Sequence, residues 1–340
     1  MSAARGTRAR AFLAAGAKLA VTVALVAWLL GRVDWSSALG RMSALSPVAG
    51  LAAAALLALQ LVLLGLRWRR VNDVLGIELG LARVLRLTWI GHFFNQVLPS
   101  GFAGDAGRAW LAVRAGVPLG LAVRSIVCDR FLGLLALVAL IACTTLAMSP
   151  PGGRVLPGQD GFRLIASATL AGLVVLALAG EPLARRLGRW PRARPLATLL
   201  GDLQHVVVSR SAVATVALAV FAHALGAFAV AVAAAGMGIA LGPAAALFVV
   251  PAVLLVAMAP VSVAGWGVRE GAIIVGLGFV GVAAADALAL SLVFGLLQVA
   301  TGVAGGVLWL AGRDRAEIRN ALRSRARSGG PAGPDAPPFP

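Results

Sequence analysis

Long apolar runs recur along this chain, and they constrain its fold more than any other feature. A run of about 20 apolar residues crosses the hydrocarbon core of a bilayer as one α-helix, since each residue adds about 1.5 Å. Because 60% of the residues are hydrophobic and 13% are charged, a soluble globular domain is excluded. The sequence therefore predicts an all-α, polytopic integral membrane protein with about seven or eight transmembrane helices. The most apolar runs are residues 12–30, 47–66, 126–148, 162–179, 211–235, 243–259 and 287–311.

We expect residues 12–312 to form a single membrane domain. A basic segment, 1–11, precedes it, and the tail at 313–340 is basic, then rich in Pro and Gly, and is expected to be disordered. A signal peptide is the alternative interpretation of residues 12–30. That run is long, however, and no small-x-small cleavage site stands out after it, so we take it as the first span.

The connecting segments are polar enough to be read as surface structure. The span at 47–66 ends in Arg67-Trp68-Arg69-Arg70, which we interpret as an interfacial aromatic residue beside a positive cluster. Residues 109–124 are expected to form a surface segment, with Asp129-Arg130 in the first turn of the span that follows. Residues 149–161 and 181–210 are expected to be loops, because the first is rich in Pro and Gly and the second holds six arginines.

The formal net charge of +17 comes from a biased distribution of basic residues. Alternate segments hold 4 (1–18), 5 (67–86), 6 (181–210) and 6 (313–327) Lys and Arg, whereas the intervening loops hold 2 (32–46), 1 (149–162) and 0 (236–243). This positive-inside pattern predicts a cytoplasmic-membrane protein with both termini in the cytoplasm. It explains the charge as a topology signal with possible anionic-lipid contacts, and no nucleic-acid partner is expected.

One stretch, 89–108, is apolar but cannot form one smooth helix, because it contains Pro99 and four glycines. Broken backbone at membrane depth is tolerated only where protein or a water-filled cavity satisfies it. We therefore predict a broken or re-entrant element near 87–108 and place the prime candidate site there. Its polar side chains are His92, Asn95, Gln96, Asp105 and Arg108.

A second broken element is expected near 260–282, and it repeats the first. Pro99-x4-Gly104-x3-Arg108 is matched by Pro260-x4-Gly265-x3-Arg269, and each carries an acid, Asp105 or Glu270. Such interrupted segments in two halves of a chain are typical of a transporter binding site. A freed helix N-terminus beside an arginine favours an anion, and glycines such as Gly267 allow close approach. The alternative is that Pro and Gly are simply common in membrane helices.

The remaining candidates have two interpretations each. Asp129, Arg130 and Asp286 either lie at membrane depth with functional partners or cap helices at the interface. Side chains of adjacent residues diverge on a helix, so we expect Asp129-Arg130 and Arg269-Glu270 to seek partners elsewhere, for example Asp105 with Arg269 and Glu270 with Arg108. For His92 a hydrogen-bonded packing role is favoured over proton relay. Asn95 and Gln96 either join neighbouring helices or line a polar cavity.

The cysteine and histidine spacing gives no metal site, and no cofactor is expected. Cys128 and Cys143 fall in one expected helix, about 22 Å apart by helical rise, so they cannot pair with each other.

Three runs together resemble the lysylphosphatidylglycerol synthase transmembrane-region family, over roughly residues 10–312. They are FFNQVLPSGFAGDAGRAW, SIVCDRFLGLLAL and PVSVAGWGVREGAI. The resemblance implies a flippase-like integral membrane protein. In the best-known members this region moves an aminoacylated phospholipid between leaflets, while a separate soluble domain makes that lipid. The sequence here ends shortly after the last span, so lysyl transfer by this chain is not expected.

We therefore expect a flippase or transporter of a phospholipid or a lipid-linked headgroup. Arg108 and Arg269 would hold a phosphate, and Asp105 and Glu270 would orient the arginines or contact a cationic headgroup. An alternative from another class is a non-catalytic membrane partner of a separate lipid-modifying enzyme or glycosyltransferase. An intramembrane enzyme is disfavoured, because the sequence presents no nucleophile–base or metal set.

Overall fold

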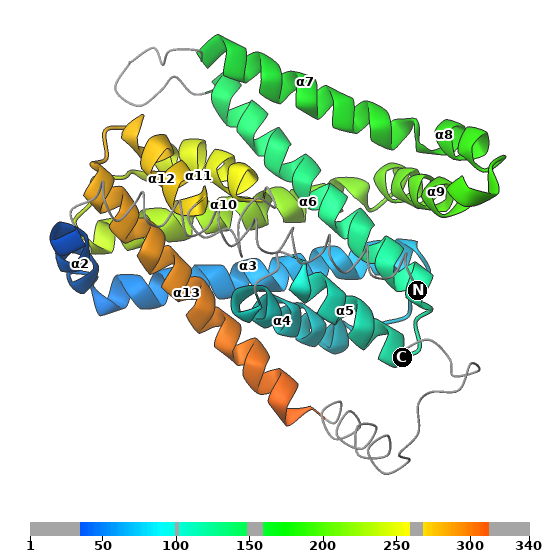
Figure 1. The fold of residues 1–340 in the computed structure, drawn as a ribbon, viewed down its shortest axis with the longest axis horizontal. Coiled ribbons are helices and arrows are strands. Elements are labelled where there is room, and N and C mark those ends of the chain that lie inside the picture. Colours follow the sequence, from blue (N-terminus) through cyan, green and yellow to red (C-terminus); the bar gives the residue numbers. More distant parts are fainter. Residues whose placement is uncertain (1–34, 99–101, 148–158, 259–267, 313–340) are drawn as a thin grey trace, which may run out of the picture.

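The computed structural model describes residues 35–98, 102–147, 159–258 and 268–312, which form helices and short connections without a β-strand (Figure 1). The longer helices are α3 (Pro47–Val74), α6 (Leu119–Ala147), α7 (Gln159–Leu178), α10 (Ala212–Gly236) and α13 (Ala284–Ala311). The shorter ones are α2 (Trp35–Ser43), α4 (Leu81–Val97), α5 (Ala103–Arg114), α8 (Gly180–Leu187), the 3₁₀ turn η1 (Pro191–Ala193), α9 (Arg194–Val208), α11 (Pro243–Ala257) and α12 (Val268–Gly278).

Four helices, α3, α6, α10 and α13, are long and apolar enough to cross a membrane, and α7 with α8 forms a bent fifth candidate within the described residues. Large apolar side chains face outward, such as Leu51 and Val213 at 74% and 83% exposure. A bilayer would cover such side chains. The all-α, polytopic membrane class is thus confirmed. Of the seven or eight expected spans, the one at 12–30 lies outside the described residues, and α11 has only 15 residues.

The first broken element is present. Helix α4 ends at Val97 and α5 begins at Ala103, and Leu98 takes an extended conformation (φ −91°, ψ 141°). The residue before a proline is disfavoured in a helix, so Pro99 accounts for the end of α4. Pro99 itself, like Pro260, Gly265 and Gly267 of the second element, lies outside the described residues. Helix α12 begins just after that second gap.

Two sequence expectations about surface segments are wrong. Residues 109–124 do not form a separate surface segment, because α5 covers the first part and α6 begins at Leu119. Asp129 and Arg130 therefore lie well inside α6 and not in its first turn. The early start is possible because Arg124 is neutralised by Asp202 of α9, 2.5 Å away. Burial raises the pKa of the Asp202 carboxyl, and the Arg124 guanidinium opposes that rise.

The expected loop at 181–210 is instead helical, as α8, η1 and α9. Its prolines lie in the first turns of α8, η1 and α9, where the missing N–H costs no hydrogen bond, so they do not break these helices. The α8 and α9 helices pack against each other through Gly180, whose ideal Cβ would lie 2.3 Å from the carbonyl oxygen of Leu200.

The chain is built from two similar halves, α3–α4–α5–α6 and α10–α11–α12–α13, each a long, two short and a long helix. The turn after the first long helix has the same sequence pattern in both, Gly76-Ile-x-Leu-Gly80 and Gly238-Ile-x-Leu-Gly242. Its first glycine has positive φ in each, 72° and 69°. A second matched pair, Gly116 and Gly281, precedes the last helix of each half with φ of 96° and 87°. The described residues thus form two similar halves, whereas Pro99, Pro260 and Gly265 of the predicted Pro–Gly–Arg repeat lie outside them.

The two halves run in opposite directions. The start of α3 meets the end of α10, because the N–H of Ser46 donates to the carbonyl oxygen of Gly236 over 2.9 Å. Further along, Gln60 of α3 lies against Gly226 of α10, so the two helices are antiparallel neighbours (Figure 1). An inverted repeat of this kind is an architecture of secondary transporters.

The halves also pack against each other through equivalent pairs of helices. Helix α4 packs on α13, and its counterpart α11 packs on α6. The helices that precede the halves follow the same rule, since α2 packs on α13 and α9 on α6. An ion pair fixes each of these, Arg41–Asp286 at 2.8 Å and Arg124–Asp202 at 2.5 Å. Asp286 therefore joins two helices near the end of a span.

The inverted repeat predicts that two equivalent turn residues lie on opposite sides of the membrane. Glu78 and Ala240 occupy the same position in the two Gly-Ile-x-Leu-Gly turns, and both are exposed. In intact cells, and with the exposed Cys143 replaced by Ser, a membrane-impermeant maleimide should label Ala240→Cys. In the same background Glu78→Cys should react only after permeabilisation, as the basic-residue bias requires. Labelling of both from the same side would contradict an inverted repeat.

Candidate functional site

A cavity of about 230 Å³ lies between the first half and α10. Helices α3, α4, α5, α6 and α10 contribute its walls, together with Met258 at the end of α11. The described residues that line it are Gln60, Leu61, Leu64, Arg67, Thr88, Gly91, His92, Asn95, Asp105, Arg108, Asp129, Arg130, Gly133, Leu134, His223 and Met258. It is therefore a polar cavity inside an apolar membrane domain, of the kind expected beside the first broken element.

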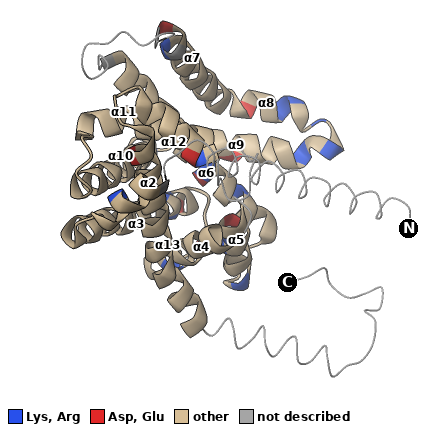
Figure 2. Cartoon of the chain, turned by 60° about the vertical axis from the view of Figure 1, so that its left-hand side comes forward, with Lys and Arg blue, Asp and Glu red and all other residues tan. Residues whose placement is uncertain are grey.

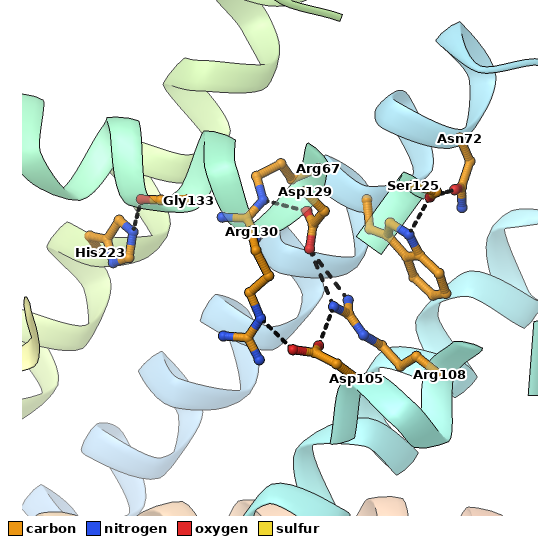
Figure 3. A network of polar contacts seen from close by, with 10 residues as sticks. Arg67, Asn72, Asp105, Arg108, Ser125, Asp129, Arg130, Gly133 and His223 are labelled. Carbon is orange, nitrogen blue, oxygen red and sulfur yellow. Dashed lines mark hydrogen bonds and ion pairs between the residues drawn. The ribbon is translucent and has the colours of Figure 1, made fainter. Parts of the chain in front are cut away.

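Five charged side chains on this wall form a continuous chain of ion pairs, which we call the charge cluster (Figure 3). Arg67 Nε lies 2.7 Å from Asp129 Oδ1, and Arg108 Nη1 lies 3.4 Å from Asp129 Oδ2. Arg108 Nη2 also lies 2.7 Å from Asp105 Oδ1, and Arg130 Nε lies 2.7 Å from Asp105 Oδ2. The positive and negative groups alternate from α3 through α6 to α5 and back to α6.

The charge cluster runs from a buried end to an open end. The side chains of Asp129 and Arg67 are 2% and 6% exposed, whereas that of Arg130 is 41% exposed. Three arginines and two aspartates give the cluster a formal charge of +1. An uncompensated charge is costly at membrane depth, so the cavity favours an anion near its exposed arginine.

Packing holds the Arg108 side chain in place. Its guanidinium lies over the ring of Trp68, 4.7 Å from the centroid, and the Trp68 indole N–H donates to Ser125 Oγ over 2.9 Å. An ideal Cβ on Gly91 would lie 2.8 Å from Arg108 Cγ, so only glycine leaves room for this side chain. Arg67 and Trp68 are buried, at 5% and 0% exposure, which corrects our interpretation of them as interfacial residues.

The start of α5 is clamped onto α4, and this fixes Asp105 and Arg108. The N–H of Gly104 donates to Asn95 Oδ1 over 2.8 Å, which satisfies one of the free donors at the helix N-terminus. An ideal Cβ on Gly104 would lie only 2.0 Å from the carbonyl oxygen of Gly91. Asn95 thus both joins two helices and lines the cavity. Gln96 instead lies against Gly302 of α13.

Two histidines on the cavity wall are used for packing between helices. His92 Nε2 donates to the carbonyl oxygen of Gln298 over 3.1 Å and ties α4 to α13, in agreement with the favoured packing role. His223 Nε2 donates to the carbonyl oxygen of Gly133 over 3.0 Å and ties α10 to α6. The two hydrogen bonds join the first half of the repeat to the second.

The expectation that the side chains of Arg269 and Glu270 diverge is wrong, although Glu270 Oε1 also accepts a hydrogen bond from Ser291 Oγ of α13 over 3.5 Å. Although these residues are adjacent, Arg269 Nη2 and Nε lie 2.6 and 3.0 Å from Glu270 Oε1, because the long arginine side chain folds back. Asp105 pairs with Arg108 and Arg130, so the expected cross-pairs between the halves are not formed by these described residues. Asp129 and Arg130 do find partners on other helices, as predicted.

The charge cluster is only partly repeated in the described part of the second half, where Glu270 of α12 stands at the position of Asp105 of α5. Counted from the matched glycines, the positions of Asp129 and Arg130 correspond to Phe294 and Gly295 of α13, and that of Arg67 to Ala229 of α10. An ideal Cβ on Gly295 would lie 2.7 Å from Arg269 Nη2. Arg269 therefore fills space next to Gly295, the position that corresponds to Arg130 in the first half. Neither Arg269 nor Glu270 is among the described residues that line the cavity.

Sequence reasoning missed Arg67, Gly133 and His223. Gly133 makes room for Arg67, since an ideal Cβ there would lie 2.8 Å from Arg67 Nη1. One available signal was the spacing of Asp129 and Gly133, which places them on one face of a helix. Both cysteines are free, and no group of metal-ligating side chains occurs in the described ranges.

Comparison with known proteins gives one family. The family model described as the lysylphosphatidylglycerol synthase TM region matches residues 16–306. The match spans both halves of the inverted repeat. No curated protein sequence matches the chain.

The close approach of α5 to α4 predicts that Gly104→Ala destabilises the protein. Because the new methyl group would meet backbone, the helices must separate, at a cost of about 1–3 kcal/mol. The matched control is Gly271→Ala in α12, where an added Cβ meets nothing within 4 Å. Thermal unfolding of the purified variants in detergent should show a lower midpoint for Gly104→Ala only. Equal midpoints would show that α5 does not depend on this contact.

Proposed function

We propose that this chain, which belongs to the lysylphosphatidylglycerol synthase transmembrane-region family, moves a phospholipid or a lipid-linked group between the leaflets of the cytoplasmic membrane. The observation that carries the proposal is the polar cavity with its charge cluster of formal charge +1. A phosphodiester headgroup carries one negative charge, and a planar guanidinium can bind it through two hydrogen bonds.

In this proposal Arg130 and Arg108 contact the phosphate. Both side chains line the same cavity, and Arg130 is the most exposed of the three arginines. The Asp105 carboxylate holds the two arginines in place when no substrate is present, and it is the group with which a phosphate would compete. Arg130 thus takes the role expected of Arg269, which is paired with Glu270.

The buried end of the cluster positions Arg108 and is assigned no contact with substrate. Asp129 accepts from both Arg67 and Arg108, and an unpaired Asp129 would be costly at its 1% exposure. The inverted repeat supports the transport step, because two halves of opposite direction can rock about a site between them and open it to each side in turn.

The proposal predicts that Arg108→Ala with Arg130→Ala abolishes transport. The experiment is leaflet-resolved lipid analysis, with an impermeant headgroup reagent, in a strain that lacks the gene for this chain and carries each variant. Arg108→Lys should retain part of the activity, because the point charge remains while the planar fork is lost. The matched control is Arg70→Ala with Arg83→Ala, which removes two exposed arginines.

Protein abundance must be measured alongside, since misfolding would also abolish transport. If the Arg108, Arg130 double variant accumulates normally and restores the wild-type outer-leaflet composition, the proposal is wrong. The charge cluster would then hold helices together, as expected of a non-transporting membrane partner of another enzyme.

A further inference from the structure

Five arginines crowd the turn between α8 and α9. They are Arg185, Arg186, Arg189, Arg192 and Arg194, and all five are exposed. Figure 2 shows basic residues gathered along this part of the chain, at one end of the molecule and away from the charge cluster. We call this surface, residues 185–194, the arginine turn.

The arginines of this turn are free to bind a ligand. Among the described residues, none of the five forms an ion pair, in contrast to Arg67, Arg108 and Arg130. Of the nearby acids, Asp202 pairs with Arg124 of α6, and Glu181 of α8 forms no ion pair within the described residues. Several exposed positive charges held this close together repel one another, so an external anion would stabilise the arrangement.

The same turn has the features of a membrane interface. Helix α8 departs by 58° from the direction of α7, with which it forms the bent candidate span, so the chain changes direction at the end of an apolar helix. Trp190, in the middle of the arginine turn, is 72% exposed, and Leu196 just after it is 50% exposed. Exposed tryptophan beside arginine is typical of the headgroup level of a bilayer, where the ring and the cation both find partners.

We propose that the arginine turn is a binding surface for the phosphate headgroups of anionic phospholipids. Its guanidinium groups match phosphate, and the exposed Trp190 and Leu196 place that phosphate next to apolar chains. The inference is independent of the transport proposal, because this surface shares no residue with the cavity.

Bound lipid would support the helix that carries the charge cluster. Helix α9 packs on α6 and α10, and the Arg124–Asp202 ion pair joins it to α6 near Asp129. Lipid headgroups bound to the arginine turn would therefore stabilise the position of α9 and, through it, that of α6.

The test uses the purified full chain in neutral detergent, titrated with dioleoylphosphatidylglycerol, with bound lipid counted by native mass spectrometry. Arg189→Gln with Arg192→Gln should weaken binding roughly 10- to 30-fold, because each arginine near an anionic surface contributes about 5-fold. The matched control, Arg70→Gln with Arg83→Gln, removes two exposed arginines elsewhere and should change binding less than about 2-fold. Thermal unfolding midpoints of both variants should equal that of the wild type.

Two further titrations define the ligand. Dioleoylphosphatidylcholine should bind the wild type and the variants alike, and inorganic phosphate at the same concentration should not displace phosphatidylglycerol. The inference is overturned if the Arg189, Arg192 variant binds phosphatidylglycerol as tightly as the wild type. It is also overturned if the control variant loses as much affinity for phosphatidylglycerol, because the binding would then depend only on overall charge. Displacement of the lipid by inorganic phosphate would overturn it as well, because the surface would then be a site for soluble anions.

Discussion

The carboxylate of Asp129 accepts hydrogen bonds from Arg67 of α3 and Arg108 of α5 at a depth where its side chain is 2% exposed. Each of these charges alone would be costly to bury, and together they are tolerable only in this geometry. Two glycines make the geometry possible, because Gly133 leaves room for Arg67 and Gly91 for Arg108. The buried Asp129 carboxylate thus joins α3, α5 and α6 along one wall of the cavity.

The inverted repeat explains the arrangement of the helices around Asp129 but not the charged side chains themselves. The two halves share helix order, turn sequences and exchanged contacts, yet the positions of Asp129 and Arg67 correspond to Phe294 and Ala229. Glu270 repeats Asp105 in the second half, but Asp129 and Arg67 are not repeated, so the cost of burying their charges is met only once. The second half contributes packing instead, through His223 and Met258 at the cavity wall.

The helical membrane fold and the broken element after α4 could be predicted because apolar runs and Pro99 act locally. The Pro–Gly–Arg spacing also predicts two halves, but the matched glycines Gly116 and Gly281 place Ile273, and not Arg269, at the position of Arg108. Arg67 could not be assigned, since a basic residue at the end of an apolar run is equally a topology signal, and only the longer α3 buries it. The helices at 181–210 could not be predicted for a similar reason, since a proline can either begin a helix or end one, and here prolines begin helices. The pairing of Arg269 with Glu270 depends on side-chain reach, which a pattern of positions does not contain.

The central claim is that the charge cluster forms part of a path for a lipid headgroup. The most direct measurement is the transbilayer exchange of headgroup-labelled phosphatidylglycerol in liposomes that contain the purified chain. We predict that the wild type accelerates exchange and that Arg130→Glu, which replaces the exposed arginine and changes the formal charge of the cluster from +1 to −1, eliminates the acceleration. Exchange at the wild-type rate in liposomes that contain folded Arg130→Glu protein would contradict the claim.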